Sequence, residues 1–282
     1  MFNRSLEEGK FPAAWKDAVV TPVPKSSKDA SLPSSYRPIA LLSSLSKVLE
    51  HFVKEQLTAF CLEHGVFPDE QFGFLKGRST EWQLLSVLED WHTSLDSKSS
   101  IHAVFLDAAK AFDRVSHTVL LSRLAAIGIG GPALKWFHSY LTGRRIATKV
   151  DGALSDYAET TSGVPQGSIL GPLLFLIYFK DIPAVVSATS ALFADDTLVY
   201  RGDCMGDQHT PCCSIEQDLK DLSHWAAASG VQFNALKSAE LCLGTYLPPR
   251  PLVLDGSEGP SCVGKNASKH SHGQETTVVS PH

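Results

Sequence analysis

The sequence predicts an α+β fold in which amphipathic helices pack on antiparallel sheets of short strands. Apolar residues recur at helical spacing over residues 45–61 and again over residues 79–95. Residues 101–106, IHAVFL, form a short segment that is nearly all apolar, which is typical of a strand buried on both faces. Residues 151–152, Asp-Gly, stand between two extended stretches and indicate a tight hairpin turn.

The composition is that of an ordinary globular protein. Of the 282 residues, 43% are hydrophobic and 20% are charged, so the chain is long and apolar enough to bury a sizeable core, and disorder throughout is excluded. No stretch approaches the roughly 18 apolar residues that a membrane span needs. Arg4, Glu7 and Glu8 occupy the place where a signal peptide would be apolar, so we expect an intracellular protein whose six cysteines are reduced.

The charge balance limits the kind of nucleic-acid binding that is possible. With 25 positive and 30 negative side chains, the formal net charge is −5. Because phosphate binding is driven by lysine and arginine, this balance argues against a protein whose whole surface binds nucleic acid. A local basic groove remains compatible with it.

In the N-terminal half, residues 17–24 predict a short strand closed by prolines, and residues 25–33 a polar loop. The first long helix is expected to begin at Ser43 or Ser44 and to end near Gly65, because these residue types favour helix ends. The second long helix runs over about residues 79–95. Its inward-facing residues are expected to be Trp82, Leu85, Leu88 and Trp91.

The C-terminal half continues with alternating helices and hairpins. The expected elements are helices at 116–127 and 132–141, a hairpin at 145–161, a buried helix at 169–179, a strand–turn–strand unit at 191–200, a helix through 215–225 that ends near Gly230, and short strands within 231–244. Beyond about residue 250 the sequence is dominated by glycine, serine and histidine. Such a segment buries too little apolar surface to offset its ordering entropy, so we expect a disordered tail.

Three aspartates are poorly explained by a structural role. Asp107 ends the strand in FLDAAKAFD, and Asp195 and Asp196 lie side by side in FADD between apolar residues. Two unit charges about 4 Å apart repel by about 4 kcal/mol at an effective dielectric constant of about 20. A divalent cation would turn this repulsion into attraction, and hard oxygen ligands favour Mg²⁺ or Mn²⁺ over zinc. The alternative is that each aspartate is a turn residue or a helix cap.

A series of segments in fixed order resembles the reverse transcriptases of non-LTR (LINE-type) retrotransposons, close to the jockey- and CR1-like groups. The resemblance covers about residues 1–245 and is carried by FPAAWKDAVVTPVPK, SSYRPIALLSSLSKVLE, QFGFLKGRST, FLDAAKAFDRVSH, SGVPQGSILGPLLF, FADDTLVY and VQFNALKS.

The resemblance implies the right-hand fold of polymerases. Residues 1–100 would form the fingers and the N-terminal part of the domain, residues 101–250 a palm with an antiparallel sheet backed by helices, and residues 251–282 the disordered tail, with no segment that resembles a thumb. It also implies an RNA-directed DNA polymerase that extends a DNA primer with dNTPs on an RNA template. The implied cofactors are two Mg²⁺ ions, with Mn²⁺ as a substitute, and a nuclear step is implied by the family alone.

The family's acidic and basic positions carry over residue by residue. Asp107, Asp195 and Asp196 match the metal-binding catalytic aspartates, with Asp195 expected to ligate more directly than Asp196. Lys25 and Arg37 match basic fingers residues that hold the incoming triphosphate, and both can neutralise charge developing on phosphates.

Three further positions match residues around the nucleotide. Phe112 matches the aromatic residue beneath the sugar, where a flat ring leaves no room for a 2′-hydroxyl; the alternative is a core phenylalanine. Gln166, in a glycine-flanked loop, matches a residue beside the nucleotide and the template, and Lys237 matches a lysine proposed to assist the leaving pyrophosphate. Asp113 is interpreted as structural, a cap for the helix near Ser116. Candidate phosphate contacts are Arg78, Arg144 and Arg145.

Two other functions remain open at this point. Because no thumb-like segment is recognisable, the chain is alternatively a catalytically inactive remnant that at most binds nucleic acid. An RNA-directed RNA polymerase shares the acidic pair, but those enzymes more often have glycine before it and lack a bulky residue under the sugar. Ala194 and Phe112 argue against this second alternative.

Overall fold

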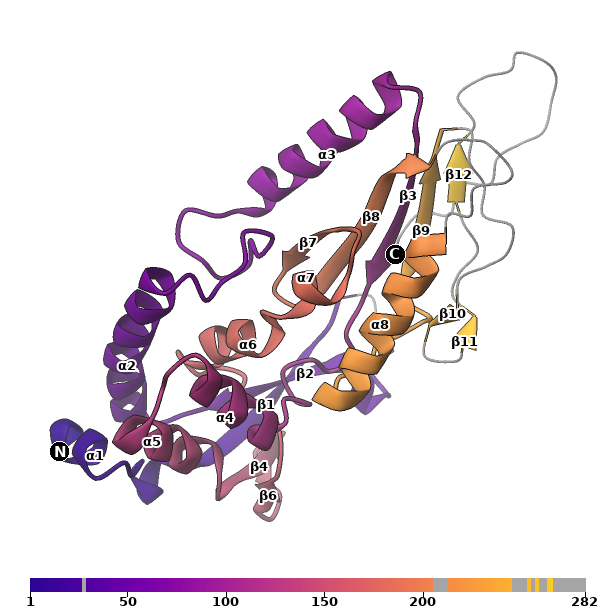
Figure 1. The fold of residues 1–282 in the computed structure, drawn as a ribbon. Coiled ribbons are helices and arrows are strands. Elements are labelled where there is room, and N and C mark those ends of the chain that lie inside the picture. The colour runs from indigo at the N-terminus through magenta and orange to yellow at the C-terminus, as the bar shows by residue number, and fades with distance from the viewer. Residues whose placement is uncertain (27–28, 205–212, 245–252, 255–256, 259–262, 266–282) are drawn as a thin grey trace.

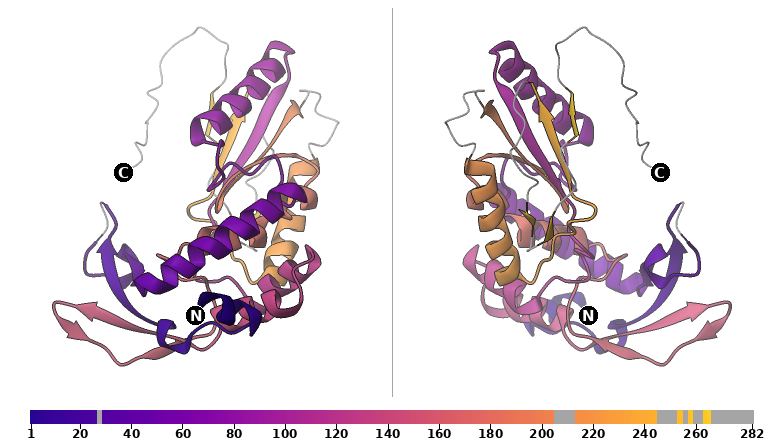
Figure 2. Two further views of the ribbon diagram at one scale, coloured as in Figure 1. Left: turned by 90° about the vertical axis from the view of Figure 1, so that its left-hand side faces the viewer. Right: turned by 90° about the vertical axis from the view of Figure 1, so that its right-hand side faces the viewer.

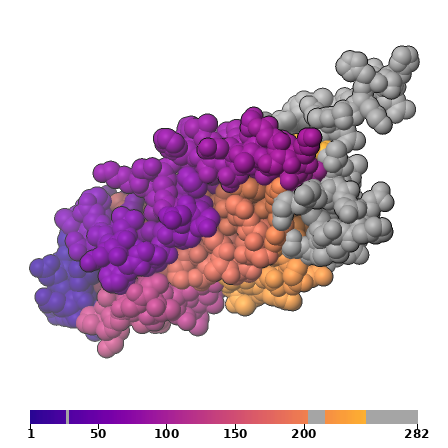
Figure 3. All heavy atoms as spheres, turned by 45° about the horizontal axis from the view of Figure 1, so that its top comes forward, coloured from indigo at the N-terminus to yellow at the C-terminus, as the bar shows by residue number. Residues whose placement is uncertain are grey.

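The computed structural model describes residues 1–26, 29–204, 213–244, 253–254, 257–258 and 263–265. They form an elongated molecule with the N-terminal residues at one end (Figures 1 and 3). The helices are α1 (Phe2–Glu7), α2 (Ser44–Glu63), α3 (Thr80–Asp96), α4 (His117–Ala126), α5 (Gly131–Leu141), α6 (Gly171–Phe179), α7 (Ile182–Val185) and α8 (Cys213–Ser229), with 3₁₀ turns η1 (Ala13–Trp15) and η2 (Pro33–Ser35). The strands are β1 (Asp17–Pro24), β2 (Tyr36–Leu41), β3 (Ser100–Leu106), β4 (Arg144–Val150), β5 (Ala153–Leu154), β6 (Ala158–Thr160), β7 (Thr189–Phe193), β8 (Asp196–Cys204), β9 (Ala239–Leu243), β10 (Val253–Leu254), β11 (Ser257–Glu258) and β12 (Val263–Lys265).

One sheet, which we call the central sheet, has the strand order β12-β9-β3-β8-β7. β3 lies in its middle and pairs antiparallel with both β8 and β9. Alternate residues of β3 point to opposite faces: Ile101 and Ala103 pack with Trp91 of α3, whereas Val104 and Leu106 join the main core, to which α8 also contributes. α3 and α8 therefore cover opposite faces of the sheet (Figure 2).

The second sheet, which we call the outer sheet, has the order β2-β1-β4-β5, with β6 also paired to β4. β1 and β2 are antiparallel neighbours, but β1 and β4 pair in parallel, with Val19 opposite Ala147. The predicted Asp151-Gly152 turn is confirmed: the two residues join β4 to β5 with φ of 50° and 85°, as a type I′ turn requires.

The core is dominated by α6, which the sequence predicts as a buried helix. Every residue from Leu173 to Phe179 is at most 3% exposed. The rings of Phe175 and Phe179 stack with centroids 4.3 Å apart. α6 has nine residues, and no helix among the described residues is long and apolar enough to cross a bilayer.

A buried glutamate ties α2 to the start of α6. Glu50 is fully buried, and its Oε2 accepts hydrogen bonds from the backbone N–H of Ile169 at 2.9 Å and of Leu170 at 3.3 Å. The hydroxyls of Ser46 and Tyr140 donate to the same carboxylate at 2.6 and 3.2 Å. The N-terminus of a helix favours a negative charge, so the carboxylate stabilises the loop that leads into α6.

Two expectations differ from the structure. The prediction that α3 buries four anchors is wrong for three of them: Trp82, Leu85 and Leu88 are 65%, 58% and 47% exposed, and only Trp91 is buried. The reason is that, of the α3 side chains, only Val87 and Trp91 belong to the buried cluster against the central sheet. The predicted disordered tail lies mostly outside the described residues, but β12 within it pairs in parallel with β9.

Replacing Glu50 tests the link between α2 and α6. Glu50→Ala removes the acceptor for two backbone N–H groups and two hydroxyls inside the core, so we expect a loss of about 3 kcal/mol in the free energy of unfolding. This corresponds to a fall in melting temperature of roughly 6–10 °C, measured by calorimetry.

The matched control is Glu55→Ala on the same helix. Glu55 is exposed and forms only a surface pair with His51, so its loss should change stability by less than about 0.5 kcal/mol. Equal melting temperatures for the two variants would contradict the assigned role of Glu50.

Candidate active site

The acidic pair lies at the turn between β7 and β8. The last residues paired across this hairpin are Phe193 and Asp196, which leaves Ala194 and Asp195 as the central residues of the turn. Ala194 has a φ of 59°. A positive φ at the first central residue matches the right-handed twist of the two strands. The predicted strand–turn–strand unit is thereby confirmed.

The pairing of β3 with β8 brings the third acid to the same place. Leu106 of β3 lies opposite Thr197 of β8 in an antiparallel register. Asp107, which follows Leu106 directly, therefore lies beside Asp196, at the end of the sheet where the β7–β8 turn also lies. The structure thus brings together the three carboxylates that the sequence singles out.

The electrostatics of the site reflect this convergence. Burial raises the pKa of Asp195, and the carboxylates of Asp196 and Asp107 raise it further. Burial and Asp107 likewise raise the pKa of Asp196. Lys237 opposes both shifts. A group of negative charges that repel one another and have a cation nearby is the arrangement expected of a site for divalent cations.

Lys237 reaches this site from the segment between α8 and β9. Its Nζ donates to both carboxylate oxygens of Asp107, at 3.1 and 3.0 Å. The backbone holds the segment in place, because the N–H of Asn234 donates to the carbonyl of Asp107 at 2.8 Å. Lys237 therefore neutralises Asp107 in this structure, a contact that the sequence does not predict.

An apolar cavity of about 420 Å³ adjoins the acids between α3 and the central sheet. Val87, Leu88 and Trp91 line it from α3, and Asp107 and Asp196 line its edge. The low polarity of this wall is consistent with the partial burial that raises the pKa values of the acids.

Phe112 is half-buried and packs against two aromatic rings. One ring face stacks on the core residue Phe175 with centroids 4.3 Å apart. The edge-on contact with Phe74, at 6.2 Å between centroids, comes from the loop that follows α2. Phe112 is therefore fixed against the core on one face of its ring, while the residue as a whole is only partly buried.

The side chain of Gln166 is held by Asp113, which the sequence predicts to cap the helix near Ser116. The Nε2 of Gln166 donates to Oδ1 of Asp113 at 2.7 Å, and its backbone carbonyl accepts from the N–H of Ala40 at 2.8 Å. The predicted capping role of Asp113 is wrong, because the hydroxyl of Ser116 caps α4 by accepting from the N–H of Val119. Asp113 instead orients the Gln166 side chain.

The basic residues differ in what they contact. Lys25 and Arg37 lie near the connection between β1 and β2, where Nζ of Lys25 donates to the carbonyl of Ser34 at 2.8 Å. Within the described part of the chain, the Arg37 guanidinium forms no hydrogen bond or ion pair, and no contact joins either residue to the aspartates.

The arginines predicted to contact phosphate already have protein partners. The buried Arg144 donates to the carbonyl of Tyr140, so the prediction is wrong for it. Arg145 forms two bonds to Asp17, at 2.9 and 2.6 Å. Arg78 donates from one nitrogen to the carbonyls of Pro68, Asp69 and Gln71.

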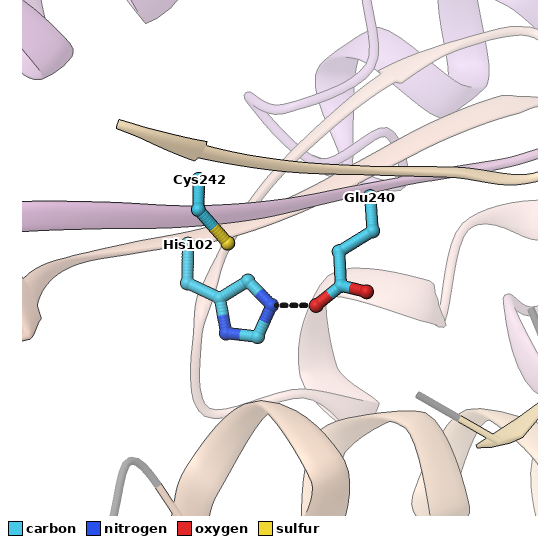
Figure 4. Close-up of side chains that lie close together, drawn as sticks. All are labelled: His102, Glu240 and Cys242. Atoms are coloured by element: carbon cyan, nitrogen blue, oxygen red, sulfur yellow. Dashed lines mark hydrogen bonds and ion pairs between the residues drawn. The ribbon is translucent and has the colours of Figure 1, made fainter. Parts of the chain in front are cut away.

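The sequence did not predict one group of possible metal ligands. His102, Glu240 and Cys242 point from β3 and β9 to the same side of the central sheet, and their ligand atoms lie within 4.8 Å of one another (Figure 4). The Nε2 of His102 lies 2.6 Å from Oε1 of Glu240. Zinc bonds of about 2.0–2.1 Å would hold such ligands about 3.3 Å apart. In this structure the group is a buried, hydrogen-bonded histidine–glutamate pair beside a thiol, on the face opposite α3.

Comparison with known proteins accords with this geometry. The family described as "Reverse transcriptase (RNA-dependent DNA polymerase)" matches residues 23–272. The chain belongs to the reverse transcriptase family. The resemblance to non-LTR retrotransposon enzymes is confirmed by relatives from Drosophila melanogaster. The probable RNA-directed DNA polymerase from transposon X-element is 36% identical over 96% of this chain, and the RNA-directed DNA polymerase from mobile element jockey is 33% identical over 86%.

This reverse transcriptase chain spans only part of those relatives, 30% of the X-element protein and 27% of the jockey protein. Among solved structures, it is similar to apo telomerase from Candida tropicalis truncated from its C-terminal domain. The TM-score is 0.57 at 12% identity, covering 81% of this chain and 50% of that one. This likeness confirms the predicted α+β polymerase fold.

Removing the acidic pair should stabilise the protein without metal. Because the pKa values of Asp195 and Asp196 are raised in the folded state, their contribution to stability falls as the pH rises through those values. At pH 7 with a chelator present, the double variant Asp195→Asn, Asp196→Asn should have a free energy of unfolding that is higher than that of the unsubstituted protein by roughly 0.5–1 kcal/mol. The gain is small because solvent screens part of the repulsion.

The gain should vanish at pH values well below 3.8, the ordinary pKa of aspartate, where both carboxyls are protonated in the folded and the unfolded state. Mg²⁺ should then stabilise the unsubstituted protein and not the variant, as measured by thermal unfolding. Asp156→Asn, on an exposed loop, is the control and should change neither result. A variant less stable than the parent at pH 7 without metal would contradict the assignment.

Proposed function

We propose that this chain is the catalytic core of an RNA-directed DNA polymerase, which adds dNTPs to the 3′-hydroxyl of a DNA primer on an RNA template. The observation that carries the proposal is the convergence of Asp107 with Asp195 and Asp196 in a chain of the reverse transcriptase family. The names of relatives from Drosophila melanogaster, which describe RNA-directed DNA polymerases, support it. The proposed RNA template and DNA primer follow from this function, whereas the proposed intracellular setting with a nuclear step is implied only by the resemblance to non-LTR retrotransposon enzymes.

The chemistry of the three acids fits the divalent cations of this family. Carboxylate oxygens are hard ligands, and two observations support a cation site here: the repulsion among the three carboxylates and the contact of Lys237 with Asp107. Asp107, Asp195 and Asp196 would hold two Mg²⁺ ions, or Mn²⁺ in their place. When bound, these ions would lower the pKa of the attacking hydroxyl and neutralise the charge on the leaving oxygens.

The other residues would position the substrate. In the proposed reaction, Lys25 and Arg37 neutralise the triphosphate, and Gln166 binds beside the nucleotide from its glycine-flanked loop. Lys237 leaves Asp107 and gives a proton to the departing pyrophosphate. The support for this last role is its place: its Nζ already lies 3.0 Å from Oδ2 of Asp107.

The proposed domains are fingers in residues 1–100 and a palm in residues 101–250. Support comes from four strands of the central sheet, β3, β7, β8 and β9, which apart from Ser100 lie within residues 101–250 and position the three acids. β4, which lies within the proposed palm range, pairs with β1 in the outer sheet. The two proposed parts are therefore joined by strand pairing as well as by the chain.

Primer extension tests the proposal directly. The purified chain, alone and joined to the segment that follows the matching region in the X-element relative, should extend a DNA primer on an RNA template when Mg²⁺ is present. Asp195→Ala with Asp196→Ala should lower the rate about a hundredfold or more. Asp156→Ala is the surface control. Extension that survives the double substitution, or absence of extension by both proteins, would overturn the proposal.

Replacing Phe112 tests the proposed selection of deoxynucleotides. Phe112→Val opens space beneath the sugar, so the ratio of kcat/KM for dNTP over rNTP should fall about tenfold or more. The matched control is Phe52→Val on α2, because Phe52 is an exposed phenylalanine outside the site. An unchanged ratio would indicate that Phe112 is only a core residue.

A further inference from the structure

The loop between α2 and α3 runs along β7 (Figure 1). Gln71 forms a parallel bridge with Leu192 of β7. The N–H of Phe72 donates to the carbonyl of Leu192, and the N–H of Leu192 donates to the carbonyl of Glu70, both at 2.8 Å. A segment more than a hundred positions earlier in the chain is thus bonded to the strand that leads into the acidic turn.

The side chain of Gln71 reaches the turn itself. Its Oε1 accepts hydrogen bonds from the N–H of Gly73 at 2.8 Å and from the N–H of Ala194 at 3.0 Å. Because both partners are N–H donors, the atom that they share has to be the amide oxygen. Gln71 is 1% exposed, so it makes these hydrogen bonds inside the protein and out of contact with bulk water.

Ala194 is a residue that needs such a partner. The hairpin pairs Phe193 with Asp196 and leaves the N–H of Ala194 outside the ladder. Ala194 is 4% exposed, and its φ of 59° is costly for a residue with a Cβ, by about 1–2 kcal/mol. A buried N–H without an acceptor would add about 1–3 kcal/mol. The turn therefore keeps this conformation because Gln71 accepts the hydrogen bond of the Ala194 N–H.

Gly73 provides an independent sign that the two segments fit closely. A Cβ at Gly73 would lie 2.3 Å from the backbone nitrogen of Ala194, so any other residue would push the turn away. Within the loop, Arg78 donates to the carbonyls of Pro68, Asp69 and Gln71 and so links the end of the loop to its beginning. The loop is thus a fixed support for the turn.

We propose that Gln71 is a positioning residue that holds the Ala194 peptide, and so fixes Asp195 and Asp196 in the arrangement that binds divalent cations. The inference rests on the proposed function, because it assigns the aspartates to the cation site. Gln71 acts through Ala194 and contacts neither the cation nor the substrate.

Binding of Mn²⁺ to the chain without nucleic acid, followed by electron paramagnetic resonance of the free ion, tests this role. The baseline is the variant Asp195→Asn with Asp196→Asn, which defines binding elsewhere. Gln71→Met has a similar length and no acceptor, so we expect its Mn²⁺ dissociation constant to rise about tenfold. Gln71→Glu keeps the accepting oxygen and should bind Mn²⁺ at least as tightly as the parent chain.

A control variant that loses a buried hydrogen bond elsewhere separates the positioning role of Gln71 from a general loss of stability. Ser5 is buried far from the site and accepts a hydrogen bond from Nε1 of Trp136, so Ser5→Ala also removes a buried bond. Its Mn²⁺ dissociation constant should match that of the parent chain even where its melting temperature falls.

The outcomes are distinct. If Gln71→Met binds Mn²⁺ as tightly as the parent chain, or if Ser5→Ala weakens binding equally, the role of Gln71 is refuted while the proposed function stands. If the parent chain binds no more Mn²⁺ than the aspartate double variant, the proposed function itself fails.

Discussion

The register between β3 and β8 is the constraint on which the candidate site depends. Leu106 opposite Thr197 places Asp107 beside the acids that open β8. Successive residues of a strand point to opposite faces, so a slip of one position would turn Asp196 away from Asp107. The register is determined by burial on both faces of β3, with Ile101 and Ala103 against α3 and Val104 and Leu106 in the main core. Apolar packing thus stabilises a concentration of negative charge that would otherwise separate.

Two buried polar side chains connect the N-terminal region to the loops around this site. Glu50 binds the backbone at the start of α6, just beyond the loop that contains Gln166. Gln71 binds the backbone of the acidic turn. In both cases a side-chain oxygen accepts from N–H groups that secondary structure leaves unsatisfied. The orientation of these loops therefore depends on where α2 and the loop after it lie, so a displacement of this region would move the site as well.

Much of the fold follows from local sequence patterns. The long helices, the Asp151-Gly152 hairpin and the buried α6 were predictable because periodicity and turn preference act over a few residues. The exposure of Trp82 and Leu85 was not, since helical spacing identifies an apolar face without showing how far the sheet beneath it extends. Asp107, Asp195 and Asp196 were identifiable because acids among apolar residues are unusual. Gln71 and His102 were missed because their partners are 123 and 138 positions away.

The parallel pairing of β1 with β4 has a consequence for shorter forms of this protein. Residues 17–20 bond along one side of residues 145–148, while β5 and β6 pair with β4 in antiparallel fashion. A chain that began after Pro24 would still contain β4, but one side of that strand would carry unpaired amides and carbonyls. Open edges of this kind recruit strands from other molecules. Through this pairing, residues 17–20 cover an edge of β4 that would otherwise be open to strands of other molecules.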